Sequence, residues 1–283
     1  MKNVYSRSFE SAPPPKNLII VTISKNTLYF ISEVCNNSNM KHHKKAFTLA
    51  EVLITLGIIG VVTALTLPTL ITNYQKQRAV TQLKADYSII AQAFERAKAD
   101  YGDMDYWGMD SFYGQTTGAN EFFKNFTEKY FIPYIKPLHN YGITTFKRIG
   151  YNALYNLDNT ENSSLLGEKY IVALANGAII SFNLDGHCDS SHVDSSGNTV
   201  CDSPFYFTSV YMILDINGQQ RPNTFGKDIF VMTTSSNKFG FYRYNSTQDN
   251  RDWLLQACSK GSKENRHCGR LIQIDGWKIN YEW

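Results

Sequence analysis

The most apolar part of the sequence lies between residues 47 and 71. Across this stretch, FTLAEVLITLGIIGVVTALTLPTLI, the only ionisable side chain is that of Glu51. A helix rises about 1.5 Å per residue, so these residues would extend about 37 Å and could cross a hydrocarbon core of about 30 Å. The pattern therefore predicts a membrane-spanning helix over residues 47–71.

A second hydrophobic pattern continues directly after this stretch. Apolar residues recur at steps of three or four, the spacing of one face of a helix, at Ala79, Leu83, Tyr87, Ile90, Phe94 and Ala97. We therefore expect one continuous helix from Phe47 to about Ala99, whose second half packs against a folded head. Gly102, within Tyr101-Gly102-Asp103, is the expected stop signal.

The remainder of the chain favours strands. An amphipathic helix is predicted at Asn120–Tyr130, before Pro133 and Pro137, and residues 138–165 indicate an irregular connection. Asn176-Gly177 is a strong hairpin signal between two β-rich runs. The predicted strands are Lys169–Ala175, Ala178–Leu184, Phe205–Ile216, Ile229–Thr234, Phe239–Tyr244 and a last one within 268–279. This is an α+β fold, an antiparallel sheet packed on the long helix.

Charge is unevenly distributed along the chain. The formal charge is +3, but residues 1–46 hold seven basic and two acidic residues, which leaves about −2 for the rest. That balance argues against a strong nucleic-acid surface, because binding to phosphates needs clustered cationic charge. The basic cluster Lys41–Lys45 just before the apolar stretch favours a cytoplasmic N-terminus, so residues 72–283 should face the periplasm or the exterior.

The order of these features is informative. In an ordinary signal peptide a small residue follows the apolar stretch, whereas here Ala46 precedes it. This order resembles the class III leader of type IV prepilins and of type II secretion pseudopilins. The resemblance implies cleavage between Ala46 and Phe47 by a prepilin peptidase, followed by methylation of Phe47. Residues 1–46 would then be removed, and Met40 is an alternative start that would give a leader of ordinary length.

The resemblance extends into the apolar stretch. Glu51 takes the fifth mature position, where the family carries a glutamate that governs assembly, and Gly60 and Pro68 also match family positions. A carboxylate in a bilayer costs on the order of 3 kcal/mol, so it usually marks function. The resemblance supplies its partner, the amine of Phe47 on a neighbouring subunit. Gly60 and Pro68 bracket a segment of low helix propensity that could melt locally on assembly.

The chain has five cysteines, and Cys35 lies in the predicted leader. The four that remain suit a disulfide framework in an exported head. Of three pairings we favour Cys188–Cys201 and Cys258–Cys268, each closing a short loop. Zinc binding is the alternative, because His187, His192 and His267 lie near these cysteines, but neither pair has the spacing of structural zinc sites.

The segment from Asp215 to Asp228 is dense in oxygen-bearing side chains. Asp215, Asn217, Asn223 and Asp228 could supply several of the six to eight oxygens that Ca²⁺ requires. The stretch resembles the late calcium-binding loop of major pseudopilins. The alternative is a tight loop held by Asx-turns and Pro222 alone.

These observations predict a filament subunit that requires no cofactor, with Ca²⁺ as an optional ligand. The resemblance implies three partners: homologous pilin subunits, prepilin peptidase and an inner-membrane assembly platform. A secretion pseudopilin and a pilus subunit fit equally well, apart from the calcium-like loop. Alternatives are a membrane-tethered adhesin-like or lectin-like protein and a DNA-binding competence pilin. The sequence contains no G-x-S-x-G, H-E-x-x-H or phosphate-binding glycine loop, so no enzyme is indicated.

Overall fold

The computed structural model describes residues 48–108, 119–162, 167–188, 191–193, 199–201, 205–235, 237–242 and 250–283. The chain divides into two units, Met1–Ile59 and Gly60–Trp283. Ala46 and Phe47, the residues at the predicted cleavage site, lie outside the described residues.

Helix α1 (Leu49–Tyr101) is continuous, as the sequence predicts, and passes through Gly60 and Pro68. It ends where the backbone N–H of Gly102 donates to the carbonyl of Lys98 at 2.9 Å. Gly102 adopts a φ of 77°, a left-handed conformation that favours glycine after a helix. The predicted apolar stripe from Ala79 to Ala97 is buried, apart from half-buried Tyr87.

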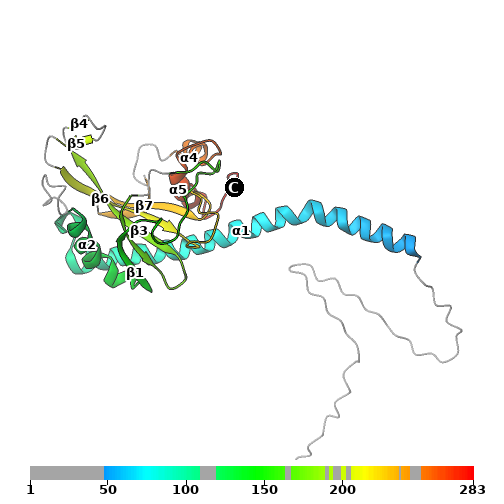
Figure 1. Ribbon diagram of the computed structural model, residues 1–283, viewed down its shortest axis with the longest axis horizontal. Helices are drawn as coiled ribbons and strands as arrows, with labels where there is room; N and C mark the ends of the chain where they lie inside the picture. The colour runs from blue at the N-terminus through cyan, green and yellow to red at the C-terminus, as the bar shows by residue number, and fades with distance from the viewer. Residues whose placement is uncertain are drawn as a thin grey trace, which may run out of the picture. The chain divides into compact units, whose positions relative to one another are not determined.

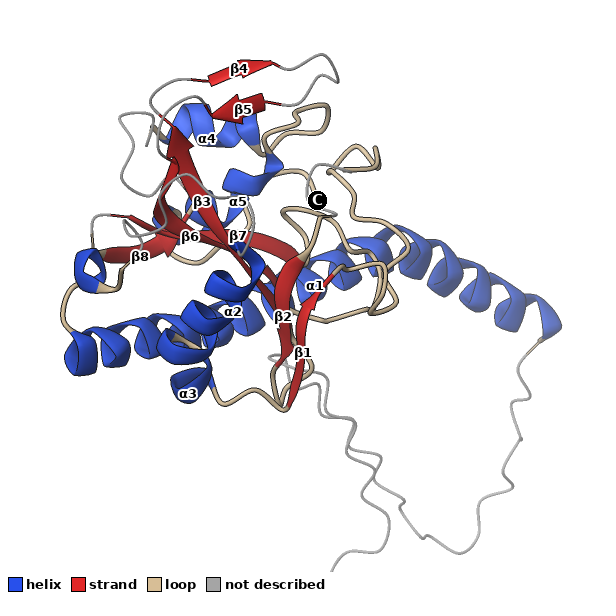
Figure 2. Cartoon of the chain, turned by 60° about the vertical axis from the view of Figure 1, so that its left-hand side comes forward, coloured by secondary structure: helices blue, strands red, loops and turns tan. Residues whose placement is uncertain are grey.

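The head contains a six-stranded antiparallel sheet in the order β1-β2-β3-β6-β7-β8. The strands are β1 (His139–Thr144), β2 (Lys169–Ala173), β3 (Ile179–Cys188), β6 (Phe205–Asp215), β7 (Ile229–Ser235) and β8 (Lys238–Phe241). A separate two-stranded sheet of β4 (Ser191–Val193) and β5 (Thr199–Cys201) is inserted between β3 and β6. The predicted α+β fold is therefore confirmed (Figures 1 and 2).

The sheet is buried on both faces, because alternate residues of its central strands enter two different cores. On one face Val172, Phe182 and Met212 pack with the stripe of α1 and with the helices α2 and α5. On the other face Ile171 and Ile213 join a smaller core that includes residues from segment 146–154 and from 225–231. The sheet thus lies between a helical layer and a layer of irregular chain, which includes the loop after β6.

The remaining helices are short. They are η1 (Met104–Tyr106), α2 (Ala119–Tyr130), α3 (Ile132–Ile135), α4 (Arg251–Ala257), η4 (Asn265–His267) and α5 (Cys268–Ile274). Helix α2 confirms the predicted amphipathic helix. The prediction of a final strand within 268–279 is wrong, because Cys268, Leu271 and Ile272 are spaced like one helical face and are all fully buried in α5.

Strand β1 was missed, since residues 138–165 were expected to be irregular throughout. Its sequence, HNYGIT, contains a glycine, and its side chains are mostly exposed or half-buried. The pairing with β2 also shifts register between Asn140 and Gly142. An edge strand with a bulge gives no clear alternation of apolar and polar residues, so the sequence offers little signal for it.

Candidate functional site

The start of α1 is held by two side chains. The carboxylate of Glu51 accepts hydrogen bonds from the backbone N–H of Thr48 at 2.9 Å and from its hydroxyl at 3.0 Å. The Thr48 hydroxyl in turn accepts from the backbone N–H of Glu51 at 3.2 Å. This reciprocal arrangement is a capping box, which satisfies donors that a helix start otherwise leaves unpaired.

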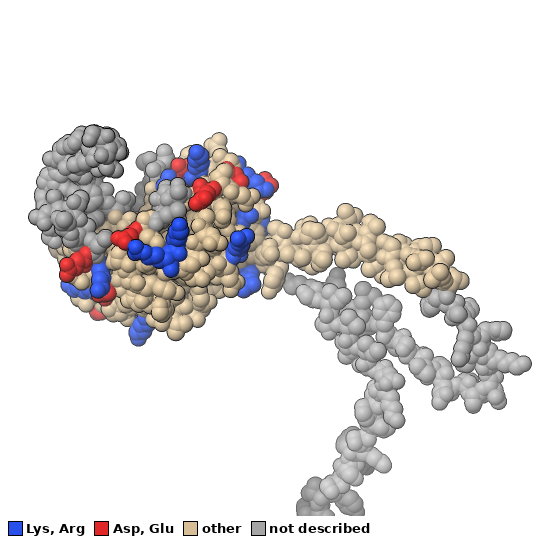
Figure 3. All heavy atoms as spheres, viewed as in Figure 1, with Lys and Arg blue, Asp and Glu red and all other residues tan. Residues whose placement is uncertain are grey.

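The first part of α1, which we call the apolar segment (residues 49–71), exposes every one of its side chains. Among the described residues, α1 is the one helix long and apolar enough to cross a membrane. On the face shown in Figure 3 this segment carries no charged side chain, whereas Lys, Arg, Asp and Glu residues are spread over the head. Exposure of so many large apolar side chains marks a surface that contacts lipid or protein.

Gly60 and Pro68 are both accommodated within the helix. Apart from the two neighbouring residues and the nearby backbone of α1 itself, no heavy atom of the described residues lies within 4 Å of the position that a Cβ on Gly60 would occupy. Pro68 has no N–H to donate to the carbonyl four residues earlier, and the Thr72 hydroxyl donates to the Pro68 carbonyl at 3.0 Å. The helix is thus intrinsically weakest here, yet unbroken.

The 215–228 loop connects β6 to β7 and begins with a buried carboxylate. Asp215 accepts hydrogen bonds from the hydroxyl of Tyr151 at 2.7 Å and from the backbone N–H of Asn217 at 3.1 Å. The second contact is an Asx-turn, the local motif expected of an aspartate before a turn. Tyr151 belongs to the irregular layer, so this bond also holds that layer against the sheet.

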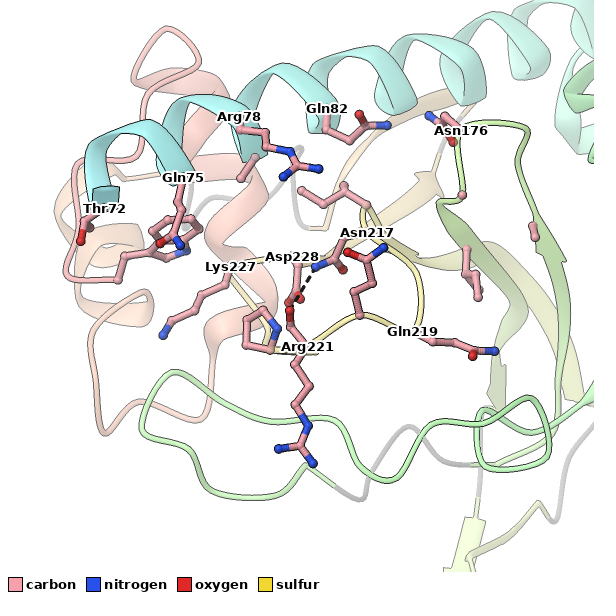
Figure 4. A pocket seen from close by; sticks show the side chains of 18 of the residues that line it. Thr72, Gln75, Arg78, Gln82, Asn176, Asn217, Gln219, Arg221, Lys227 and Asp228 are labelled. Carbon is pink, nitrogen blue, oxygen red and sulfur yellow. Dashed lines mark hydrogen bonds between the residues drawn. The ribbon is translucent and has the colours of Figure 1, made fainter. Parts of the chain in front are cut away.

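A second buried carboxylate closes the loop. Asp228 accepts from the backbone N–H of Asn223 at 2.8 Å and of Thr224 at 2.6 Å. The Asn217 side chain hydrogen-bonds to the same carboxylate, as Figure 4 shows. The predicted residues Asp215, Asn217, Asn223 and Asp228 are therefore brought together by the fold.

The electrostatics of this cluster are unfavourable for two anions. Burial, and then the nearby charge of Asp228, raise the pKa of Asp215 well above its ordinary value. Burial raises the pKa of Asp228 from 3.8 to about 6. Two desolvated carboxylates that repel each other become more stable when a proton or a cation neutralises one of them.

Two further oxygens of the cluster have spare acceptor capacity. The side-chain oxygens of Asn217 and Asn223 are buried and have no hydrogen-bond partner among the described residues. No group of three or more His, Cys, Asp or Glu residues suited to a metal ion occurs in the described part of the chain. The donor set is thus two carboxylates and two amides, a composition of hard oxygens compatible with Ca²⁺ but short of a complete shell.

The loop is fixed by a close backbone contact with the β2–β3 hairpin. Gly218 has a φ of 65°, and a Cβ there would lie 2.5 Å from the carbonyl oxygen of Gly177. Only glycine fits this position without movement of the backbone. The position of the loop therefore depends on the hairpin that Asn176-Gly177 forms.

Cys258 and Cys268 form a disulfide, which confirms one of the two predicted pairs. Both are fully buried, and their bridge joins the end of α4 to the start of α5. These two thiols are oxidised, so they are not zinc ligands. The side chains of Cys188 and Cys201 lie outside what the structure describes, and this second pair stays a prediction.

The start of α1 also has a signal in the sequence. Thr48-x-x-Glu51 directly before an apolar run is the capping-box pattern, and it locates the helix start at Leu49. By contrast, the contact between Tyr151 and Asp215 has no sequence signal, because 64 positions separate the two residues.

The long helix with an exposed apolar segment and the antiparallel head define a type IV pilin-like precursor. A model of the prokaryotic N-terminal methylation motif matches residues 41–67, which agrees with this class and with processing at the leader. Beyond that motif, the chain belongs to a family of unknown function, DUF6613, whose model matches residues 69–283. No curated protein and no solved structure matches the chain.

Proposed function

We propose that this protein is a subunit of a type IV pilus-like or type II secretion pseudopilus filament. It is cut between Ala46 and Phe47 by prepilin peptidase and held in the inner membrane until an assembly platform inserts it into the filament. The observation that carries this proposal is the exposed apolar segment, whose side chains are all uncovered in the single chain. Such a surface requires a bilayer before assembly and neighbouring helices after it.

Glu51 gives this helix its register in the proposed filament. It is the only ionisable residue of the apolar segment and lies near its start. In a packed bundle of apolar helices an unpaired carboxylate is far more costly than a carboxylate paired with the amine of Phe47 of a neighbouring subunit. Each subunit would therefore stop at the axial position where this pair forms.

Mass spectrometry of the protein extracted from membranes tests the processing step. The proposal expects a mature chain that begins with N-methylated Phe47. Purification of an intact leader from cells with active prepilin peptidase would contradict it. A tethered adhesin-like or lectin-like protein would keep its binding activity after Glu51→Ala, whereas a filament subunit would lose polymerisation.

We further propose that the 215–228 loop binds Ca²⁺ in the mature head. The supporting observation is the pair of buried, unpartnered oxygens of Asn217 and Asn223 beside two buried carboxylates. A bound cation would supply positive charge and so offset the repulsion between Asp215 and Asp228. A calcium site here would favour a secretion pseudopilin over a pilus subunit, because the calcium-binding loop is the feature that distinguishes the two.

Thermal unfolding of the full chain in detergent tests the calcium proposal. The melting temperature should rise when Ca²⁺ is added after EDTA treatment, and Asn223→Ala should abolish the rise. Asn280→Ala is a suitable control, because Asn280 is exposed and its amide donates to Asp275 at 2.9 Å and not to a residue of the loop. An unchanged melting temperature in the unmodified protein would show that hydrogen bonds alone hold the loop.

A further inference from the structure

A cleft of about 860 Å³ lies between α1 and the 215–228 loop. Its helical wall begins at Thr72, directly after the apolar segment, and continues through Gln75 and Arg78. The opposite wall comes from the loop, and Asn176 of the β2–β3 hairpin closes one side. Figure 4 shows Arg78 reaching from α1 toward the loop.

The cleft is cationic. Arg78, Arg221 and Lys227 all line it, and none of them forms an ion pair within the described part of the chain. Asp228 is the only acidic side chain in the lining, and it is 4% exposed with both oxygens accepting backbone N–H groups. The cations are therefore the main groups that remain free to bind a ligand, because the amide nitrogens of Gln82 and Gln219 already donate to Asp86 and to the Ile149 carbonyl.

An unpaired donor also belongs to this lining. The indole Nε1 of Trp283 is buried and has no hydrogen-bond partner among the described residues. A buried indole N–H normally finds an acceptor. Arg78, Lys227 and the orphaned N–H together indicate a ligand with several acceptor oxygens and negative charge, whereas the Arg221 side chain extends away from α1 (Figure 4).

The place of the cleft along α1 indicates where that ligand comes from. Arg78 is seven residues beyond Ile71, or about 10 Å along the helix, and a bilayer has about 5–7 Å of headgroup region on each side of its core. Thr72 and Gln75 would lie within that layer, and the long Arg78 side chain can reach back into it. Tyr74, which is 66% exposed, is an aromatic residue suited to the same interface.

We propose that this cleft binds the phosphate of an anionic phospholipid headgroup at the outer surface of the inner membrane. Arg78 and Lys227 pair with the phosphate oxygens, and the glutamine amides contact the polar part of the headgroup. The bound lipid would hold the unassembled subunit at a fixed depth in the bilayer. The inference rests on the membrane anchoring that forms part of the proposed function.

Calorimetric titration of the full chain in a nonionic detergent tests the site without a membrane or filament. The probes are dihexanoyl phosphatidylglycerol, dihexanoyl phosphatidylcholine and inorganic phosphate. Arg78→Gln combined with Lys227→Gln removes two cations of the cleft. Arg78 is exposed and Lys227 is half-buried. Lys124→Gln combined with Lys147→Gln is the matched control, because it removes two exposed cations that do not line the cleft.

The proposal expects one phosphatidylglycerol per chain, with phosphatidylcholine binding at least tenfold more weakly. The cleft variant should bind phosphatidylglycerol about thirtyfold more weakly, from about fivefold per cation, and the control should bind normally. Thermal unfolding of each variant verifies that it is folded.

Three results would overturn the proposal. Equal affinity for phosphatidylglycerol in all variants would place lipid on the apolar segment instead of in the cleft. Inorganic phosphate that binds as tightly, and is lost in the cleft variant, would identify a free-anion site. Loss of chemical crosslinking between copies in the cleft variant, with lipid binding unchanged, would identify an acidic surface of a second copy as the ligand.

Failure here is distinguishable from failure of the proposed function. Lipid binding in detergent is measured on the chain whether or not Phe47 becomes the mature N-terminus. Conversely, a correctly processed and polymerising protein that binds no phosphatidylglycerol would refute only the lipid site.

Discussion

Glu51 and Thr48 cap each other at the start of α1, through three hydrogen bonds of 2.9 to 3.2 Å. The same glutamate is the only ionisable residue of the apolar segment. Its side chain therefore has two separable roles, one local to the helix start and one that depends on its charge. A loss of assembly in Glu51→Ala alone would not tell these roles apart.

Glu51→Gln separates them. Glutamine also completes a capping box, so the helix start should survive while the charge is lost. We expect polymerisation, followed by electron microscopy or by shearing of surface filaments, to fail in Glu51→Gln. Thr48→Ala is the converse control, because it removes a cap contact worth about 1 kcal/mol and keeps the charge. If Thr48→Ala abolishes filaments and Glu51→Gln does not, capping and not charge governs assembly.

Asp86 should make the stability of the head depend on pH. It is fully buried on α1 and accepts hydrogen bonds from Asn176 at 2.6 Å and from Gln82 at 3.2 Å. Burial raises the pKa of this carboxyl above 3.8, so the folded state holds its proton more tightly than the unfolded state does. The resulting stabilisation is complete at pH values below the pKa of Asp86 in the unfolded chain. It is lost as pH rises through the pKa of Asp86 in the folded protein.

Denaturant unfolding of the full chain and of Asp86→Asn between about pH 2.5 and 7 measures this effect. The free energy of unfolding of the unmodified protein, minus that of the variant, should increase as pH falls. Asp158→Asn should give the opposite trend below about pH 4, because hydrogen bonds from Thr160 lower the pKa of Asp158 and the stabilisation is lost as pH falls through that pKa. Identical trends in the two variants would mean that Asp86 does not titrate as its burial requires.

Gly218→Ala should displace the 215–228 loop. The alanine Cβ would meet the Gly177 carbonyl oxygen at 2.5 Å, in addition to the strain of a φ of 65°. We expect denaturant unfolding to show that the free energy of unfolding falls by more than the cost of backbone strain alone, which is about 1–3 kcal/mol. Gly261→Ala isolates that strain, since Gly261 has a φ of 87° and open space around its Cβ position. Equal losses in the two variants would show that the loop moves freely away from Gly177.

Removal of the disulfide by Cys258→Ser with Cys268→Ser should lower the free energy of unfolding by about 2–3 kcal/mol. The bridge closes a short loop, with a sequence separation of 10, so its effect on the unfolded chain is modest. Denaturant unfolding with and without reductant checks the value. A reductant effect that persists in the double variant would come from another bridge, and peptide mapping would then show whether Cys188 is joined to Cys201.

The sequence determined the features that depend on neighbours along the chain. The 3.6-residue period predicts the buried stripe of α1, and Gly102 predicts the end of this helix. Asn176-Gly177 predicts the β2–β3 hairpin. Each of these features is a local choice of backbone conformation. The leader order around Ala46 and the isolated Glu51 likewise need no tertiary information. Local patterns failed where segments are irregular or short, as at β1 and α5.

Which distant residues meet follows from the packing of separate elements and cannot be predicted from local sequence. The loop oxygens of Asp215 and Asp228 are predictable as a cluster, but their burial, and hence their raised pKa values, depends on Tyr151 and the irregular layer. The cleft beside Arg78 likewise depends on how the loop packs near α1. Periodicity records which face of an element is apolar, whereas desolvation and charge proximity arise only when separate elements pack together.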